Sequence, residues 1–213
     1  MRPRYFYHLS KRLFDVIMCS VLVVLLMPLI LITSLLIAAT SRGPILYAQK
    51  RVGKDRKLFT CYKFRSMVHN ADQKPYFEFL AQAFNNNYGS GAPKSHVEFK
   101  TKDQRLTKIG KIIRVLSIDE LPQLINVIKG EMSLIGPRPD VPESVELYSE
   151  FEKKRLSVKP GISGLWQVSG RSNLTLRDMF VLDNLYVDNQ SFLLDLQIFV
   201  RTIFVVMTMK GSG

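Results

Sequence analysis

The sequence predicts a mostly helical α+β protein that rests on one face of a membrane, an arrangement called monotopic. Three observations predict it: an uncharged apolar run near the N-terminus, two strand-like segments directly after it, and amphipathic helical segments further along. We therefore expect an N-terminal re-entrant helix hairpin, a small β-hairpin and interfacial amphipathic helices. Residues 1–42 would form the membrane anchor, and residues 43–213 a domain at the membrane surface.

The charge balance points to an anionic partner. The 213 residues include 30 Lys and Arg against 18 Asp and Glu, which gives a formal net charge of +12. Nucleic acid, anionic lipid and phosphorylated substrates are the partners that such a balance favours. The two cysteines lie in an apolar run and in a strand-like segment, which indicates reduced thiols and not a disulfide framework.

The uncharged run between Val16 and Ala39 is long enough to cross a bilayer. As a helix its roughly 24 residues would extend about 36 Å, against a hydrocarbon core about 30 Å thick. Pro28 lies near the middle of the run, where a proline removes a backbone hydrogen bond and bends a helix. Both flanks are basic, as cytoplasmic ends are, with Arg2, Arg4, Lys11 and Arg12 before the run and Arg42, Lys50, Arg51, Lys54, Arg56 and Lys57 after it. From this segment alone, a helix that enters the bilayer and returns to the same face and a single kinked span are equally supported, and the family resemblance described below favours the first.

Two strand-like segments, residues 45–52 and 57–65, flank a turn at residues 53–56 and predict a β-hairpin. The second segment alternates so that Lys63 and Arg65 lie on one face of the strand. Two neighbouring cations suit a diphosphate. The alternative is an ordinary basic face exposed to solvent.

Residues 117–139, SIDELPQLINVIKGEMSLIGPRP, hold the most informative pattern of the chain. Asp119 and Glu120 stand directly before Pro122, and a proline is tolerated only in the first turn of a helix, so both carboxylates lie at a helix start. This short helix is expected to end at Gly130 and to turn an apolar stripe toward a core, formed by Leu121, Leu124, Ile125 and Ile128.

The acid pair has a structural and a chemical interpretation. Ser117 and Glu120 have the spacing of a capping box, in which both acids would simply satisfy a helix end. Pro122 would then stand at the fifth helical position, where its ring is poorly tolerated. In the chemical interpretation, the unpaired N–H groups of the helix start hold carboxylates or phosphate.

Three further segments bear on the site. Residues 107–116 predict a helix whose basic face carries Arg114 toward the acid pair, and that face would meet either an anionic membrane surface or solvent. Residues 159–171 contain three glycines, and Trp166, Gln167 and Arg171 offer stacking, hydrogen bonds and charge to a nucleotide or sugar. An ordinary glycine-rich loop is the alternative there. Residues 191–209 predict an amphipathic helix that is buried or lies in the membrane interface.

In combination and in order, these segments resemble the bacterial sugar transferases, also described as monotopic phosphoglycosyl transferases. The resemblance covers most of the chain and is carried by Lys11 to Asp15, Tyr62 to Met67, Arg105, Thr107, Gly110, Arg114, Ser117 to Gln123, Asn126, Val127, Met132 to Pro139, Pro160 to Gly164 and Gln167 to Arg171. Each of these motifs is weak alone, but their ordered combination is specific.

The resemblance implies transfer of a sugar 1-phosphate from a UDP-sugar to polyprenol phosphate. In this family the first acid of the pair is a nucleophile, so Asp119 would attack the sugar-bearing phosphate, expel UMP and form a covalent phosphosugar intermediate. Glu120 would position a metal or the acceptor, and Mg²⁺ held by both acids would offset the diphosphate charge. The residues expected to cradle phosphate are Lys63, Arg65, Arg114 and Arg138, and those expected to contact nucleotide or sugar are Gln167 and Arg171.

The same resemblance predicts location and partners. The catalytic domain would work at the cytoplasmic face of the bacterial inner membrane, where transfer to undecaprenyl phosphate begins an O-antigen, capsule or exopolysaccharide. The wording of residues 164–171, GLWQVSGR, is closer to family members that transfer a hexose 1-phosphate. A homodimer stays open, and nucleic acid is not an expected partner. Two alternatives are a non-catalytic basic module that binds anionic lipid or nucleic acid, and a membrane metalloenzyme that hydrolyses a phosphoester.

Overall fold

The structure is a computed structural model, and it describes residues 5–68, 70–72, 74–85, 105–170 and 174–208. Within these ranges the chain is mostly helical with two small sheets, which confirms the predicted α+β class. The helices are α1 (Tyr5–Thr40), α2 (Lys74–Asn85), α4 (Lys108–Val115), α5 (Gln123–Lys129), α6 (Pro142–Glu146), α7 (Glu150–Lys153), α8 (Leu165–Ser169), α9 (Leu176–Asp188) and α10 (Phe192–Thr208). The strands are β1 (Leu46–Val52), β2 (Leu58–Phe64), β3 (Ser133–Ile135) and β4 (Gly161–Ser163), and the short 3₁₀ turns are η1 (Lys54–Arg56), η2 (Ile118–Glu120) and η3 (Lys154–Ser157).

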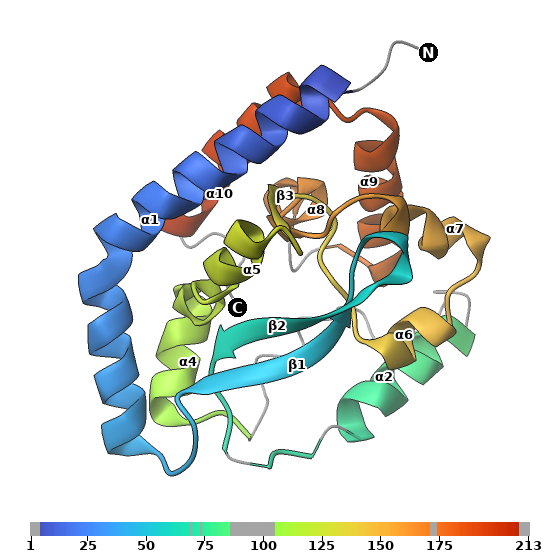
Figure 1. Cartoon of the computed structure of the whole chain (residues 1–213). Helices are drawn as coiled ribbons and strands as arrows, with labels where there is room; N and C mark the ends of the chain where they lie inside the picture. The colour runs from blue at the N-terminus through green and yellow to red at the C-terminus, as the bar shows by residue number, and fades with distance from the viewer. Residues whose placement is uncertain (1–4, 69, 73, 86–104, 171–173, 209–213) are drawn as a thin grey trace.

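Helix α1 wraps one side of the molecule and is visibly bent part-way along its length (Figure 1). It runs beside α10 at its N-terminal end and passes α5 and α4 toward its C-terminal end. It is a single helix of 36 residues with Pro28 inside it, in place of the two antiparallel helices of a hairpin. By length and composition α1 is able to cross a membrane, with a mean hydropathy of 3.0 over its most apolar window.

Both ends of α1 are fixed to the same folded body. Near the N-terminal end, Arg12 donates hydrogen bonds to the backbone carbonyls of Val127 and Ile128 at the end of α5. Directly after the C-terminal end, Ser41 accepts from the guanidinium of Arg65, which follows β2. Between these two attachments the helix exposes a long apolar surface, formed by Val21, Val24, Leu25, Met27, Leu31, Ile32, Leu35 and Leu36.

The predicted β-hairpin is confirmed. β1 and β2 pair antiparallel from Leu46 opposite Phe64 to Val52 opposite Leu58, and η1 closes the turn between them. In Figure 1, α4 and α5 lie nearer the open end of the hairpin, and α6, α7 and α9 lie nearer its turn. The hairpin therefore lies between the helices near its open end and those near its turn.

A second, parallel pair joins β3 to β4, and the sequence did not indicate it. Two glycines of the 159–171 segment, Gly161 and Gly164, serve this pairing, since a Cβ on Gly161 would lie 2.1 Å from the backbone nitrogen of Gly136. Such a distance is far below a normal contact, so the two segments of the chain approach this closely only because both Gly136 and Gly161 lack a side chain. Here the glycine-rich segment has a packing role.

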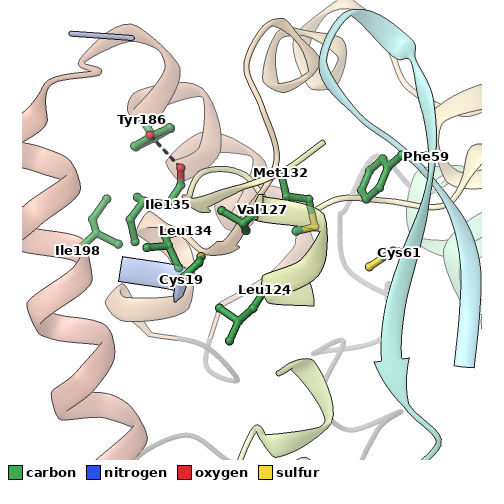
Figure 2. Close-up of a cluster of buried hydrophobic side chains, with 10 residues drawn as sticks. All are labelled: Cys19, Phe59, Cys61, Leu124, Val127, Met132, Leu134, Ile135, Tyr186 and Ile198. Atoms are coloured by element: carbon green, nitrogen blue, oxygen red, sulfur yellow. Dashed lines mark hydrogen bonds between the residues drawn. The ribbon is translucent and has the colours of Figure 1, made fainter. Parts of the chain in front are cut away.

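The main core lies between the elements that meet at α5 and β3 (Figure 2). Its buried side chains come from α1, β2, α5, the segment leading into β3, β3 itself, α9 and α10, and they are Cys19, Phe59, Cys61, Leu124, Val127, Met132, Leu134, Ile135, Tyr186 and Ile198. Both cysteines are free and buried. Helices from the two ends of the chain thus close over the same core that supports the acid pair.

The predicted helix at residues 191–209 is confirmed as α10, and it is apolar on its exposed face as well as on the face that meets the core at Ile198. Asp195 is buried and pairs with Lys11 of α1 at 2.8 Å, whereas large apolar side chains are exposed, including Leu193, Val200, Phe204 and Met207. α5 behaves similarly, because Ile125 and Ile128, expected in the core, are exposed. The stripe prediction for α5 was therefore wrong for these two residues, since periodicity alone does not say which apolar face meets protein.

Candidate active site

The acid pair forms a short turn between two helices. Asp119 and Glu120 belong to η2, which connects α4 to α5, and Pro122 directly precedes α5. Ser117 begins the turn in the left-handed region, with φ of 57°, and its side chain makes no capping hydrogen bond. The capping-box interpretation was therefore wrong, and the two carboxylates are available for other contacts.

Glu120 is held by two cations from different elements. Lys63 of β2 lies 3.2 Å from its carboxylate, and the guanidinium of Arg138 donates to both of its oxygens. A fork of this kind fixes the carboxylate plane as well as its position. Glu120 thereby links the hairpin to the Pro137-Arg138-Pro139 turn and leaves Asp119 as the acid that faces the cavity.

Asp119 lines a cavity of about 590 Å³ although the residue as a whole is only 7% exposed. Burial raises the pKa of its carboxyl group, and the neighbouring charge of Glu120 raises it further. Lys63, Arg114 and Arg138 act in the opposite direction because they favour the charged form. Such a carboxylate is poorly solvated and sits beside three cations, which is a suitable setting for a nucleophile directed at phosphate.

The cavity wall is rich in cations. Its charged members are Arg51, Lys63, Arg65, Arg105, Arg114, Arg138 and Arg155, against the carboxylates of Asp119, Asp140 and Asp183. The remaining wall is largely apolar and includes Leu46, Tyr47, Phe64, Met67, Trp166 and Phe180. A cavity of this size that combines apolar walls with a few charged groups has the usual features of a small-molecule site.

Of the eight residues predicted for the site, five line this cavity: Asp119, Lys63, Arg65, Arg114 and Arg138. Glu120 lies behind them and pairs with two of them. Gln167 is buried in α8 and is not among the lining residues, although its neighbour Trp166 is. Arg171 lies outside the described residues.

Arg65 lines the cavity but its guanidinium is directed to the end of α1. It donates to the backbone carbonyl of Ser41 at 2.8 Å, to the Ser41 hydroxyl at 2.7 Å and to the carbonyl of Pro44. The side chain is buried among these acceptors. These contacts are those of a residue that joins α1 to the hairpin, so its predicted contact with phosphate stays a prediction.

Sequence reasoning missed a second cluster of charged side chains on the same wall. Arg155 lies 2.8 Å from Asp183 of α9 and donates to the hydroxyl of Tyr148 at 2.9 Å, and that hydroxyl donates to Asp140 at 2.7 Å. Arg51 completes the cluster at 3.9 Å from Asp140. None of these residues belongs to the motifs that revealed the acid pair, and Asp183 stands in an otherwise ordinary helix.

Asn126 holds the hairpin in register with the acid pair. Its amide nitrogen donates to the carbonyl of Thr60 and to Glu131, each at 2.7 Å, and its amide oxygen accepts from the backbone N–H of Tyr62 at 3.2 Å. This fully buried side chain therefore fixes β2, which carries Lys63, against α5, which follows Asp119 and Glu120.

Residues 6–209 match the family model described as bacterial sugar transferase. The chain belongs to the bacterial sugar transferase family. This membership confirms the resemblance inferred from the motifs, and it makes the protein an enzyme. The alternative of a non-catalytic basic module is thereby excluded.

Several relatives of this sugar transferase are similar over nearly its whole length. The exopolysaccharide production protein ExoY of Sinorhizobium fredii is 39% identical over 209 residues, which cover 96% of this chain and 88% of the relative. The undecaprenyl-phosphate galactose phosphotransferase of Salmonella typhimurium is 40% identical over 203 residues, 95% of this chain and 41% of the relative. An Aeromonas hydrophila enzyme named UDP-N-acetylgalactosamine-undecaprenyl-phosphate N-acetylgalactosaminephosphotransferase is 37% identical over 99% of this chain and 46% of its own length.

Proposed function

We propose that this sugar transferase moves a sugar 1-phosphate from a UDP-sugar to polyprenol phosphate, with Asp119 as a covalent nucleophile. The observation that carries the proposal is the placement of Asp119 on the wall of a cation-lined cavity, with Lys63, Arg114 and Arg138 as its charged neighbours. The names of the Salmonella and Aeromonas relatives, which specify undecaprenyl phosphate as the acceptor, support the reaction class.

The proposed reaction has two displacements at phosphorus. In the first, a carboxylate oxygen of Asp119 forms a bond to the sugar-bearing phosphorus while the bond to the UMP oxygen breaks, and UMP leaves. In the second, an oxygen of polyprenol phosphate attacks the same phosphorus, releases Asp119 and yields a polyprenyl diphosphate sugar. Each displacement moves negative charge between oxygens, so fixed cations on the wall stabilise both transition states.

Glu120 would act as a positioning residue in this scheme. Its carboxylate orients Lys63 and Arg138 from opposite elements, so both cations stay directed at the space in front of Asp119. Arg114 reaches the same space from α4, the helix that leads into the acid turn. Three cations from three separate elements would therefore surround a diphosphate and hold it in line with the nucleophile.

Mg²⁺ fits this carboxylate pair as an ion shared with substrate. Among the described residues no three His, Cys, Asp or Glu side chains are grouped to bind a metal by themselves. Mg²⁺ commonly binds through one or two carboxylates together with substrate phosphates and water, so Asp119 would be the first protein ligand, and Glu120 would join it only by giving up a contact with a cation. The raised pKa of Asp119 is consistent with a site that gains from a nearby cation. When bound there, Mg²⁺ would neutralise charge on the diphosphate.

We also propose that α1 enters and leaves the bilayer on one face, with the active site on the cytoplasmic side of the bacterial inner membrane. Lys11 and Arg12 before the apolar stretch contact the same body that Ser41 contacts after it. A straight span would carry these two attachments to opposite faces. The bend of α1, with Pro28 within the helix, would allow both ends to stay at one interface (Figure 1).

The donor we propose is a UDP-hexose. The GLWQVSGR wording of residues 164–171 favours this class, and the galactose in the name of the Salmonella relative is consistent with it. The acceptor would approach from the lipid side, where exposed apolar side chains of α1 and α10 would be immersed. The soluble donor in the cavity and a lipid phosphate that arrives from this side would then meet at one nucleophile.

Release of UMP by purified protein in detergent tests the proposed function. With Mg²⁺, a panel of UDP-sugars and undecaprenyl phosphate, we expect UMP to form from one donor and to depend on the acceptor for turnover. Asp119→Asn should lower the rate by at least about a thousandfold, because an amide cannot form the covalent intermediate. Asp55→Asn is the matched control, since Asp55 is exposed in η1 and far from the acid turn in the hairpin register.

The products separate this transferase from a phosphoester hydrolase. A transferase forms a lipid-linked diphosphate sugar in an amount equal to the UMP released. A hydrolase forms free sugar phosphate and needs no acceptor. The proposal would be overturned if folded protein released UMP from none of the UDP-sugars. It would also be overturned if Asp119→Asn and the original chain released UMP at equal rates.

A further inference from the structure

A second charged cluster lines the same cavity as Asp119. Its members are Arg51 of β1, Asp140 in the turn before α6, Arg155 of η3 and Asp183 of α9. In Figure 1, α9, which carries Asp183, stands near the turn of the hairpin, whereas α4 and α5 stand near its open end. One cavity therefore joins two groups of charges that come from different parts of the chain.

The two groups adjoin at Arg138. The side chain of Arg138 pairs with Glu120, and its backbone carbonyl accepts a hydrogen bond from Arg155. For a ligand whose phosphate lies before Asp119, Arg138 therefore connects the position of that phosphate to the second cluster. Whatever is attached to that phosphate would extend along this wall.

The charges of the second cluster balance, whereas those near Asp119 do not. Two arginines face two carboxylates in the second cluster, so it offers a phosphate no net attraction. Near Asp119 and Glu120, three cations face two carboxylates. The phosphate end of a ligand is therefore drawn to Asp119, and a neutral group is better suited to the wall at Asp183.

Asp183 has acceptor capacity that the protein leaves unused. The residue is 1% exposed, it lines the cavity, and neither carboxylate oxygen accepts a hydrogen bond from any described residue. Its ion pair with Arg155 supplies charge at 2.8 Å without filling that capacity. A buried carboxylate without hydrogen-bond donors is costly, and a ligand that brings hydroxyl groups would remove the cost.

Trp166 adds an aromatic surface to the same cavity. It lies in α8 and is the single tryptophan of the chain. Aromatic faces pack against the C–H face of a sugar or against a base, while carboxylates accept from hydroxyls at the ring edge. Asp183 and Trp166 together offer both kinds of contact.

We propose that the second cluster, together with Trp166, is the subsite for a neutral, hydroxyl-bearing ring of the donor, and that Asp183 accepts hydrogen bonds from its hydroxyls. This inference rests on the proposed function, because it places the phosphates of the donor at Asp119. The ring is either the transferred sugar or the ribose, which share vicinal hydroxyls. A ribose is present in both UDP and a UDP-sugar, whereas the transferred sugar is present only in the UDP-sugar.

Three probes divide the donor into its parts: inorganic pyrophosphate, UDP and UDP-galactose. Affinity is measured by the fluorescence of Trp166 for the full chain in detergent, and by competition for pyrophosphate. For Asp183→Asn we expect pyrophosphate to bind equally well or more tightly, because the substitution removes a negative charge from the wall. The smallest probe that contains the ring should bind to Asp183→Asn at least about tenfold more weakly than to the original chain, as expected for losing a hydrogen bond to a charged acceptor.

The pattern of losses identifies the ring. A loss that begins with UDP assigns the cluster to the ribose, and a loss confined to UDP-galactose assigns it to the sugar. Asp188→Asn is the matched control, because Asp188 lies on the same helix but is exposed and pairs with Lys154 at 2.7 Å. It should leave all three affinities unchanged.

Two results would overturn the inference. One is unchanged affinity for all three probes in folded Asp183→Asn, and the other is an equal loss for all three, which would indicate a general structural effect. If Asp183→Asn does not fold, Trp166→Phe read by competition calorimetry replaces it, with the same expected selectivity for ligands that contain the ring. If the unaltered protein binds none of the probes, the proposed function itself fails, and that outcome is distinct from the other two.

Discussion

At the residue scale, two carboxyl groups on one cavity wall have pKa values above the ordinary range of an aspartate. For Asp119 the main cause is burial, followed by the charge of Glu120. For Asp183 burial raises the pKa to about 7, and the nearby charge of Arg155 only partly opposes that effect. Both groups are therefore costly to keep charged in the folded protein, which is expected where carboxylates are prepared for a ligand.

The raised pKa of Asp183 predicts a specific pH dependence of stability. Its folded pKa lies above the value of about 3.9 for an unfolded chain, so the folded state binds more protons between these two values. The unfolding free energy should therefore fall as the pH rises from about 4 to 7, by on the order of 4 kcal/mol from this group, and should level off above pH 7.

Melting temperatures of the original chain and of Asp183→Asn between pH 5 and 8 test this prediction. Asparagine does not titrate, so the original chain should lose stability relative to the variant as the pH rises, by several degrees in Tm. The comparison removes the contribution of Asp119 and other groups, because they are common to both proteins. Parallel curves across this pH range would show that Asp183 is charged at every pH studied.

At the element scale, the hairpin is attached to α1 through one buried side chain. Arg65 follows β2, and the two terminal nitrogens of its guanidinium donate to acceptors at Ser41 and Pro44. The same residue stands in a motif that the family resemblance associated with phosphate. The structure supports the attachment more directly, because two carbonyls and a hydroxyl already accept from both terminal nitrogens of the guanidinium.

Arg65→Lys separates these two roles. A lysine keeps the charge but cannot reproduce the planar fork that reaches two carbonyls and a hydroxyl. If Arg65 joins α1 to the hairpin, the variant should lose about 1–3 kcal/mol of stability, and its affinity for UDP should stay within about twofold. Arg56→Lys, at an exposed position in the hairpin turn, is the control. Unchanged melting with UDP binding weakened tenfold would instead assign Arg65 to phosphate.

The elements also show which parts of the fold a sequence can predict. The hairpin, α4 and α10 were predicted correctly because each depends on a local period of two or about 3.6 residues. The parallel pair of β3 and β4 was not, because the two strands are distant in sequence and each is only three residues long. Ile125 and Ile128 were assigned to the core because an apolar stripe looks the same whether protein or lipid covers it.

The residues of the candidate site also divide into those that a sequence can predict and those that it cannot. Asp119, Glu120 and Arg138 were found because they stand in one motif framed by prolines. Asp183 could not be found, because its importance comes from burial, from its contact with Arg155 and from its place on the cavity wall. These are properties of the folded chain, and no local pattern in α9 marks them.

At the scale of the whole molecule, polar attachments and apolar surfaces are arranged for an interface. Lys11, Arg12 and Ser41 fix both ends of α1 to one body. Exposed apolar side chains cover α1 and α10, which lie side by side in Figure 1, and continue on α5 at Ile125 and Ile128. An apolar surface of this extent is unfavourable in water, so we expect lipid to cover it.

Cysteine labelling of intact cells tests how α1 lies in the membrane. After Cys19 and Cys61 are replaced, single cysteines are placed at Arg2, Leu31 and Lys50, before, within and after the apolar stretch. If α1 returns to the face from which it enters, positions 2 and 50 should both react with a membrane-impermeant maleimide only after the inner membrane is opened. Position 31 should stay protected in both conditions, because lipid surrounds it.

A kinked single span predicts a different pattern, with one of positions 2 and 50 reactive in intact cells and the other reactive only after permeabilisation. That pattern would also require Lys11 to leave Asp195, or Arg65 to leave Ser41, because one folded body cannot hold both ends of a helix that crosses the bilayer. Pro28→Leu extends the test: if the bend keeps both ends on one face, a straighter α1 should move position 2 to the opposite side in a fraction of molecules and lower activity in proportion. Labelling that is unchanged by Pro28→Leu would mean that the attachments of Arg12 and Arg65, and not the proline, determine how α1 lies.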